Sequence, residues 1–270
     1  MAGRIYWVDG VSRLIRWHEL STGKTESVAT PSMVGSIGLA NDGRLVAGLV
    51  DGIYTVELAT GACAPLYRPE PPDTSVRFND GKVDPQGRYV CGSMGVKAEP
   101  NAQLVRVDAA GEHRILATGI RIANSLCFSP DGSTMYFSDS LDRMIRAYRY
   151  SAADEPLDMP RVFVDTQAWR SGPDGATVDA DGCLWVALVQ AGKIARFTPS
   201  GELDRLIEAP TDMPSCVAFG GSDLSTLFVT SIKDSGTGRA VSRHPSGGYL
   251  FAIDGLGVKG LPEPRFGSGA

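Results

Sequence analysis

Histidine is scarce in this chain. The 270 residues contain three histidines, His18, His113 and His244, which hold unrelated positions. A zinc hydrolase needs several imidazole ligands, and a Ser-His-Asp triad needs a histidine between its other two members, so the sequence argues against both kinds of site. It also has no GxSxG or HExxH motif and no GxGxxG that opens a helix. Nucleotide and hydride chemistry therefore have no support.

Blocks of like charge and long apolar runs are also missing. Lys and Arg total 26 against 31 Asp and Glu, a net charge of −5 without a basic stripe, so no nucleic-acid partner is expected. No run approaches the roughly 18 apolar residues of a membrane span, and the start, MAGRIYWVDG, is not a secretion signal. The five cysteines are isolated and form no CxxC pair. Buried thiols in a reducing compartment predict a cytoplasmic protein without a membrane partner.

A repeat of short apolar runs fills the chain. Six runs follow turn signals at intervals of roughly 40 to 50 residues, the period of a propeller blade. Each run alternates apolar with polar residues, and a second run and a glycine-containing turn come after it, which is the pattern of half-buried strands in hairpins. No helical period is sustained. The sequence predicts an all-β fold, a six-bladed β-propeller in one domain over residues 1–270. The runs begin at residues 3, 43, 87, 132, 182 and 224.

The first blade is predicted to lack its inner strand. Five runs precede the apolar runs as inner strands, namely SMVGSIGLA, RFNDGKV, RIANSLCF, GPDGATV and MPSCVAF. A complete ring of six blades needs six. The first apolar run starts at Gly3, so the inner strand of its blade would have to lie before Met1. Either the ring closes imperfectly or the sequence begins late.

Oxygen-bearing side chains occupy one repeated position in three successive inner strands. Asn79, Asn124 and Asp174 each lie eight residues before a turn glycine. Equivalent positions of propeller blades face the same central space, so these side chains are predicted to converge. The other two inner strands carry Gly35 and Cys216 there, which means that the fold does not demand a polar residue. Oxygen donors without His or thiolate suit Ca²⁺, Mg²⁺ or Mn²⁺ better than a soft metal.

Long motifs of the chain resemble the senescence marker protein-30/gluconolactonase family. They are RFNDGKVDPQGRYVCGSM, the Ile-x-Asn stretch before SPDG, PDGATVDADGCLWVAL, CVAFGGSDLSTLFVTS and GGYLFAIDGLGVKG, which together cover essentially the whole chain. The resemblance implies a six-bladed propeller with one divalent cation, Ca, Zn, Mn or Mg, that hydrolyses sugar lactones such as gluconolactone.

The family's site residues carry over one by one. The Ile-x-Asn and Pro-Asp-Gly motifs imply Asn124 and Asp174 as metal ligands, and Asp174 is also the expected general base. The Arg-x-Asn-Asp-Gly motif implies Arg77 and Asn79 as substrate-binding residues, and a lid-loop glutamate is matched loosely by Glu99. The family's first ligand, a glutamate in the first inner strand, has no counterpart. With one negative ligand instead of two, the chain is expected to hold metal weakly and react slowly.

Alternative interpretations stay open at this stage. Asp174 would otherwise cap its own turn, and Arg77 would otherwise form a surface ion pair. The missing strand suits a non-catalytic propeller that binds metal or sugar acids, and a phosphotriesterase-like hydrolase is a second alternative. The sequence does not define the oligomeric state.

Overall fold

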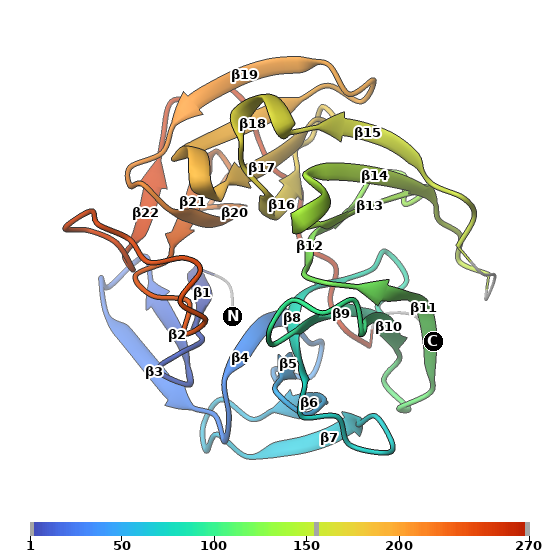
Figure 1. Ribbon diagram of the computed structural model, residues 1–270. Helices are drawn as coiled ribbons and strands as arrows, with labels where there is room; N and C mark the ends of the chain where they lie inside the picture. Colours follow the sequence, from blue (N-terminus) through green and yellow to red (C-terminus); the bar gives the residue numbers. More distant parts are fainter. Residues whose placement is uncertain (1–2, 154–156, 268–270) are drawn as a thin grey trace. The chain divides into compact units, whose positions relative to one another are not determined.

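The computed structural model describes residues 3–153 and 157–267, and nearly all of its regular structure is β-strand (Figure 1). The chain divides into two compact units. The first unit is Met1–Ala123 with Glu263–Ala270, and the second unit is Asn124–Pro262. The single domain over residues 1–270 stays a prediction.

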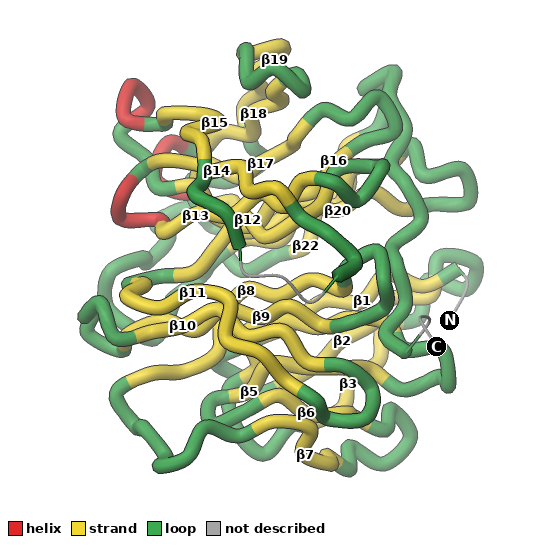
Figure 2. The backbone as a smooth tube through the Cα atoms, turned by 90° about the vertical axis from the view of Figure 1, so that its right-hand side faces the viewer, coloured by secondary structure: helices red, strands yellow, loops and turns green. Residues whose placement is uncertain are grey.

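The first unit contains three antiparallel sheets, one of three strands and two of four. Every strand pairs with the next strand along the chain, so the strands within a sheet are joined as hairpins. Figure 2 shows one of these sheets with its four neighbouring strands, β8 to β11. The strands are β1 (Arg4–Asp9), β2 (Leu14–Glu19), β3 (Thr25–Ala29), β4 (Val34–Leu39), β5 (Leu45–Leu49), β6 (Ile53–Val56), β7 (Cys63–Tyr67), β8 (Val76–Val83), β9 (Tyr89–Gly95), β10 (Ala102–Val107) and β11 (His113–Ile120).

The second unit contains three further antiparallel sheets, two of four strands and one of three. Three short 3₁₀-helices connect its strands: η1 (Ser140–Asp142), η2 (Gln167–Trp169) and η3 (Val189–Ala191). The strands are β12 (Ala123–Phe128), β13 (Thr134–Asp139), β14 (Met144–Arg149), β15 (Arg161–Asp165), β16 (Pro173–Val178), β17 (Leu184–Leu188), β18 (Lys193–Phe197), β19 (Leu203–Glu208), β20 (Pro214–Gly220), β21 (Thr226–Ser231) and β22 (Leu250–Ile253).

The predicted fold class, a six-bladed β-propeller, is confirmed by the six antiparallel sheets, whose strands follow one another along the chain. All five predicted inner strands form, as β4, β8, β12, β16 and β20. Within the described residues, the first sheet begins with β1, the run predicted as a second strand, and has three strands. The prediction that the first blade lacks its inner strand is therefore also confirmed.

The turn glycines close the hairpins as the repeat predicted. Gly87 and Gly182 have φ angles of 78° and 79°, which favour glycine because a side chain would be strained there. In these turns the aspartate three residues earlier accepts backbone hydrogen bonds: Asp84 from Gln86 and Arg88, and Asp179 from Asp181 and Cys183. The D-x-x-G sequence that these two turns share thus stabilises them through local hydrogen bonds.

Each unit packs apolar residues between neighbouring sheets. Tyr89 and Val105 belong to a buried cluster of the first unit, and Leu184 and Phe197 to one of the second. Period-two alternation explains these clusters because it places one set of side chains on each face of a strand.

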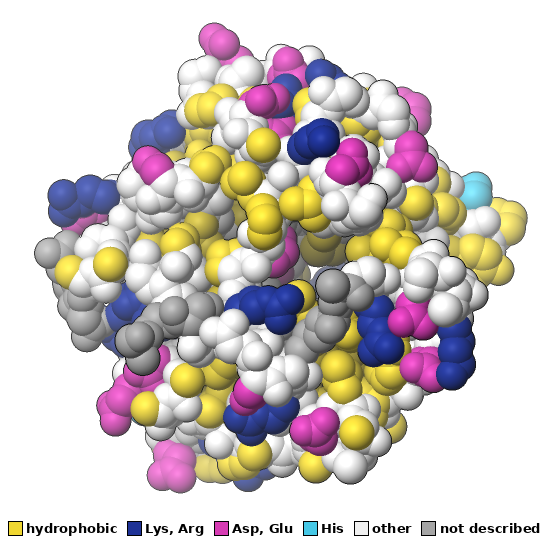
Figure 3. Space-filling model, turned by 180° about the vertical axis from the view of Figure 1, so that it is seen from behind, with side chains coloured by type: hydrophobic (Ala, Val, Ile, Leu, Met, Phe, Trp, Pro, Cys, Tyr) yellow, Lys and Arg dark blue, Asp and Glu magenta, His cyan; other side chains and the backbone are white. Residues whose placement is uncertain are grey.

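The described surface carries charges of both signs. Figure 3 shows acidic and basic side chains interspersed with uncharged and apolar ones on the face that it draws. Among the described residues, no helix combines the length and the apolar character that crossing a membrane requires.

Candidate functional site

A β-bulge lies at the level of the predicted site in four inner strands. In β8, Asn79 and Asp80 lie opposite a single residue of β9, because Phe78 pairs with Ser93 and Gly81 pairs with Cys91. In β16, Asp174 and Gly175 likewise lie opposite a single residue of β17, between the paired residues Pro173 and Ala176. The pairings of β4 and β20 shift at the same level, between Val34 and Ser36 and between Pro214 and Cys216. Bulges re-aim side chains and are common beside active sites.

In the first unit, the bulge of β8 joins Arg77 and Asn79. Arg77 Nη1 donates hydrogen bonds to Asn79 Oδ1 at 2.9 Å and to the Phe78 carbonyl at 3.1 Å. Asn79 Nδ2 donates to the carbonyl of Ala123 at 2.9 Å. Both side chains are half-buried. Because Ala123 is covalently bonded to Asn124, the Asn79 amide holds the backbone that leads directly into the next predicted site residue.

In the second unit, two serines link Asn124 to the start of β16. Asn124 is 7% exposed, and its Nδ2 donates to Ser140 Oγ at 2.8 Å. Ser140 Oγ in turn donates to the Pro173 carbonyl at 2.7 Å. Because Nδ2 donates to Ser140, the amide of Asn124 is held with Oδ1 on the side away from Ser140. These hydrogen bonds thus link β12 and η1 to the start of β16, the strand that carries Asp174.

Ser125 makes the second link. Its Oγ donates to the Asp174 carbonyl at 2.6 Å, and its side chain is fully buried. Ser125 has a φ of 56°, a left-handed conformation that is uncommon for a residue other than glycine. Such backbone strain persists only where the surroundings hold it, and it clusters at functional sites.

Glycines let the inner strands approach closely at this level. A Cβ added to Gly35 would lie 2.6 Å from the Asn79 carbonyl oxygen, and one added to Gly175 would lie 2.4 Å from Cys216 Sγ. Asp174 is half-buried beside this contact, and Cys216 is exposed. A larger residue at either glycine would displace the strand that carries its neighbour.

Glu99 lies in the turn between β9 and β10. Its side chain is exposed, and its Oε2 accepts a hydrogen bond from the Lys97 backbone N–H at 3.0 Å. This bond caps the local turn, and Ala98 within the turn has a φ of 66°. The described residues contain no group of three or more His, Cys, Asp and Glu placed to hold a metal ion. Asn124 is outside the residue types of such a group.

Comparisons with known proteins define the family of the chain. The chain matches the SMP-30/Gluconolactonase/LRE-like region over residues 1–233. It belongs to this family. A protein of Pseudomonas putida named 6-deoxy-6-sulfogluconolactonase is 33% identical over 266 residues, 97% of this chain and 90% of the relative. Regucalcin of Xenopus laevis is 31% identical over 273 residues, 98% of this chain and 91% of the relative.

A solved structure of the family has the same fold. It is described as a calcium-binding protein, regucalcin, from Agrobacterium tumefaciens, and it is 30% identical with a TM-score of 0.89, covering 98% of this chain and 90% of the other. The structure of a luciferin-regenerating enzyme reaches a TM-score of 0.88 at 27% identity, covering 98% of this chain and 92% of the other. The family assignment made from the motifs is confirmed.

Sequence reasoning missed the residues that support the site in this SMP-30/gluconolactonase family member. Ser125 follows a predicted ligand directly, and Ser140 lies 16 residues after it. Neither belongs to the repeated register position, so the repeat carried no signal for them. A signal for Ser125 was its place directly after a predicted ligand in β12, since a small hydroxyl residue there can bond to the backbone of the neighbouring strand β16.

Proposed function

We propose that the protein is a divalent-metal-dependent hydrolase that opens sugar lactones such as gluconolactone with water. The observation that carries the proposal is the hydrogen-bonded arrangement of Asn124 and Asp174 through Ser125 and Ser140. Family membership and the lactonase name of the Pseudomonas relative support it. That name describes a gluconolactone with a sulfonate, so lactones with an anionic substituent are among the substrates to test.

The residues fit a hard divalent cation. Asn124 Oδ1 and the Asp174 carboxylate are the expected ligands, and both are oxygen donors of the kind that Ca²⁺ and Mg²⁺ prefer. The Nδ2 bond to Ser140 determines where Asn124 Oδ1 points. One carboxylate supplies one negative charge, so the affinity is expected to be low. When bound, the cation would polarise the lactone carbonyl and stabilise negative charge on its oxygen.

The chain's own residues have separate tasks in the reaction. Asp174 accepts a proton from the attacking water, whose oxygen forms a bond to the carbonyl carbon. The ring C–O bond then breaks, and Asp174 passes the proton to the ring oxygen, which gives the open hydroxy acid and restores the carboxylate. Arg77 and Asn79 orient the sugar hydroxyls, and their mutual hydrogen bond at 2.9 Å limits the freedom of both side chains. Glu99 is the candidate substrate contact from the turn.

Lactone hydrolysis tests the proposal directly. The purified chain with excess Ca²⁺, Mn²⁺, Mg²⁺ or Zn²⁺ should open gluconolactone faster than the spontaneous background, and Asp174→Ala should abolish the increase. Glu202→Ala is the matched control, because it removes one exposed carboxylate elsewhere in the second unit. Metal-dependent hydrolysis that survives in Asp174→Ala would place the chemistry elsewhere.

A non-catalytic function is the second candidate. The first sheet has three strands within the described residues, and the sequence is expected to lack a counterpart of the family's first glutamate ligand. This feature favours a propeller that binds a cation or a sugar acid without turnover. Cation binding measured by calorimetry, together with no hydrolysis over several lactones, would support this function over the lactonase. A phosphotriesterase-like activity is tested by the same assay with a phosphotriester.

A further inference from the structure

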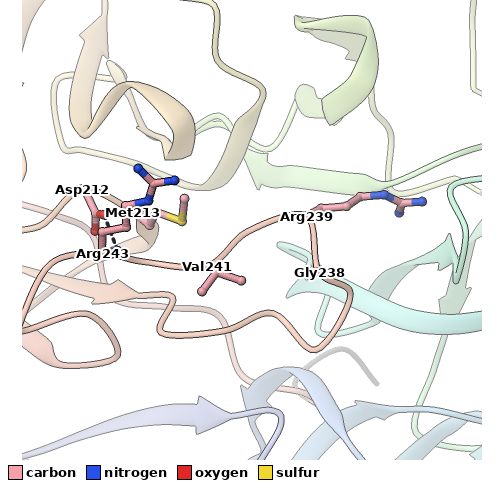
Figure 4. A pocket seen from close by; sticks show the side chains of 6 residues that line it. All are labelled: Asp212, Met213, Gly238, Arg239, Val241 and Arg243. Carbon is pink, nitrogen blue, oxygen red and sulfur yellow. Dashed lines mark hydrogen bonds between the residues drawn. The ribbon is translucent and has the colours of Figure 1, made fainter.

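A cavity of about 490 Å³ opens in the second unit beside the start of β20. It is lined by Asp212 and Met213, which precede the strand, and by Gly238, Arg239, Val241 and Arg243 of the segment after β21 (Figure 4). Figure 4 shows Arg243 beside Asp212 and Met213, with Arg239 extending from the loop on the other side. The proposed roles of Asn124 and Asp174 do not use any of these residues.

The cavity carries a positive charge. Two arginines and one aspartate line it, which leaves one net positive charge. In the described part of the chain, the guanidinium groups of Arg239 and Arg243 have no hydrogen-bond or ion-pair partner, although both side chains are exposed. Arg196 of β18, by contrast, is paired with carboxylates. An arginine without such a partner keeps its donors available for an anion.

The single acid of the cavity holds the loop. Asp212 Oδ2 accepts the backbone N–H of Arg243 at 2.8 Å, and its Oδ1 accepts from Ser242 Oγ. The Ser242 hydrogen bond lowers the pKa of Asp212, so the carboxylate stays ionised at neutral pH. Asp212 therefore anchors the backbone of Arg243 while the Arg243 guanidinium remains exposed. Arg239 is anchored less firmly, through its own N–H to Thr237.

The cavity lies at the same end of the inner strands as Asp174. The η3 loop contacts both places: Gln190 Oε1 accepts the Gly172 N–H at 2.7 Å, and a Cβ on Gly192 would lie 3.5 Å from the Asp212 carbonyl oxygen. Gly175, which follows Asp174, also lies against Cys216, three residues after Met213 of the cavity lining, because a Cβ on Gly175 would be 2.4 Å from Cys216 Sγ. The cavity is therefore at the end of β20 that is next to Asp174. A sugar whose carbonyl lies at Asp174 can extend toward it.

From this arrangement we infer that the cavity binds an anionic substituent at the end of the sugar remote from the lactone carbonyl. The group is a sulfonate, phosphate or carboxylate, Arg243 is its main contact, and Arg239 adds to the attraction. The inference rests on the proposed lactonase function and specifies its substrate class. An anion here gains charge-assisted hydrogen bonds that a hydroxymethyl group lacks.

Binding of the open-chain acids tests the inference without requiring turnover. Calorimetry should show that 6-phosphogluconate and glucarate bind about 10-fold more tightly than gluconate, as expected for a partly exposed charge-assisted contact. Arg243→Gln should remove most of this preference. Arg239→Gln should lower it about threefold, because Arg239 is the less firmly anchored of the two. Binding of gluconate should stay within about twofold in both variants.

The control variant is Arg161→Gln, which removes an exposed arginine from β15 of the same unit. It should leave all three affinities unchanged, since a distant surface charge is screened by salt. Kinetics with gluconolactone and its 6-sulfo and 6-phospho derivatives form a second arm, in which kcat/KM should follow the same order. Equal affinity for charged and uncharged acids would overturn the inference even if gluconolactone is hydrolysed. Arginine-dependent preference without hydrolysis of any lactone would support the inference and refute the lactonase.

Discussion

Ser140 provides a sharp test of the site, because its hydroxyl connects Asn124 with β16. We predict that Ser140→Ala weakens cation binding more than it weakens the fold. The substitution removes the acceptor of Asn124 Nδ2 at 2.8 Å and the donor to the Pro173 carbonyl at 2.7 Å. Asn124 is 7% exposed, so water does not readily replace the lost partner. A buried polar group left unsatisfied costs about 1–3 kcal/mol.

The substitution is expected to lower both the stability of the fold and the affinity for a cation. Without Ser140 Oγ, the Asn124 amide is no longer restricted to the orientation that presents Oδ1 to a cation. Loss of a group that orients a ligand typically costs 10–100-fold in metal affinity. We therefore expect a rise of that size in the dissociation constant for Ca²⁺ or Mn²⁺, measured by calorimetry or by competition with a chelating dye, and a loss of about 1–3 kcal/mol in unfolding free energy.

Ser138→Ala is the matched control for this experiment. Ser138 is fully buried two residues earlier, and its Oγ donates one similar bond of 2.8 Å to the Met144 carbonyl. Its removal should lower stability by a comparable amount and leave cation affinity unchanged. If both alanine variants are destabilised equally and bind the cation as the parent does, Ser140 is a purely structural residue and the reasoning fails.

Three further predictions concern packing, a buried ion cluster and the thiols. Gly175→Ala places a Cβ 2.4 Å from Cys216 Sγ, so it should cost about 1–3 kcal/mol in denaturant unfolding and reduce lactone hydrolysis; a neutral outcome would show that the two strands adjust freely. Arg196→Gln leaves the fully buried Asp179 without its 2.7 Å cation partner and should cost about 3–5 kcal/mol in the same assay, whereas a loss below 1 kcal/mol would contradict burial of the pair. Because burial raises the pKa of the Cys91 thiol to about 12, Cys91 should resist Ellman's reagent at pH 8 while the exposed Cys216 reacts, and rapid labelling of Cys91 in the folded chain would contradict its buried position.

Local patterns were sufficient to predict the strands and their turns. Period-two alternation and the turn glycines depend on residues near each other in the sequence, which is why the inner strands β4, β8, β12, β16 and β20 could be located in advance. The missing inner strand of the first blade also followed from counting runs. The propeller class needed only the length of the repeat.

The bulges and their hydrogen bonds could not be predicted in this way. The common register of Asn79 and Asp174 assumed regular pairing, in which one extra residue would turn a side chain to the other face. The structure instead places both residues in bulges, where two residues oppose one. A bulge depends on how neighbouring inner strands approach each other, and a single sequence does not report that distance. The bond of Glu99 to Lys97 is likewise a property of the turn's conformation.

The bulges explain why one position can carry such different residues in different blades. The backbone irregularity recurs in β4, β8, β16 and β20, whereas the repeated position carries Gly35, Asn79, Asp174 and Cys216. In β20 the shift lies one residue earlier, at Ser215. The backbone thus supplies the geometry, and the side chain can vary with the neighbour that it meets. Gly35 is small because the backbone of Asn79 lies against it, and Gly175 is small because Cys216 does. Polar side chains therefore fit at the site where the adjacent strand carries glycine. The chemistry of the site depends on its glycines as much as on its ligands.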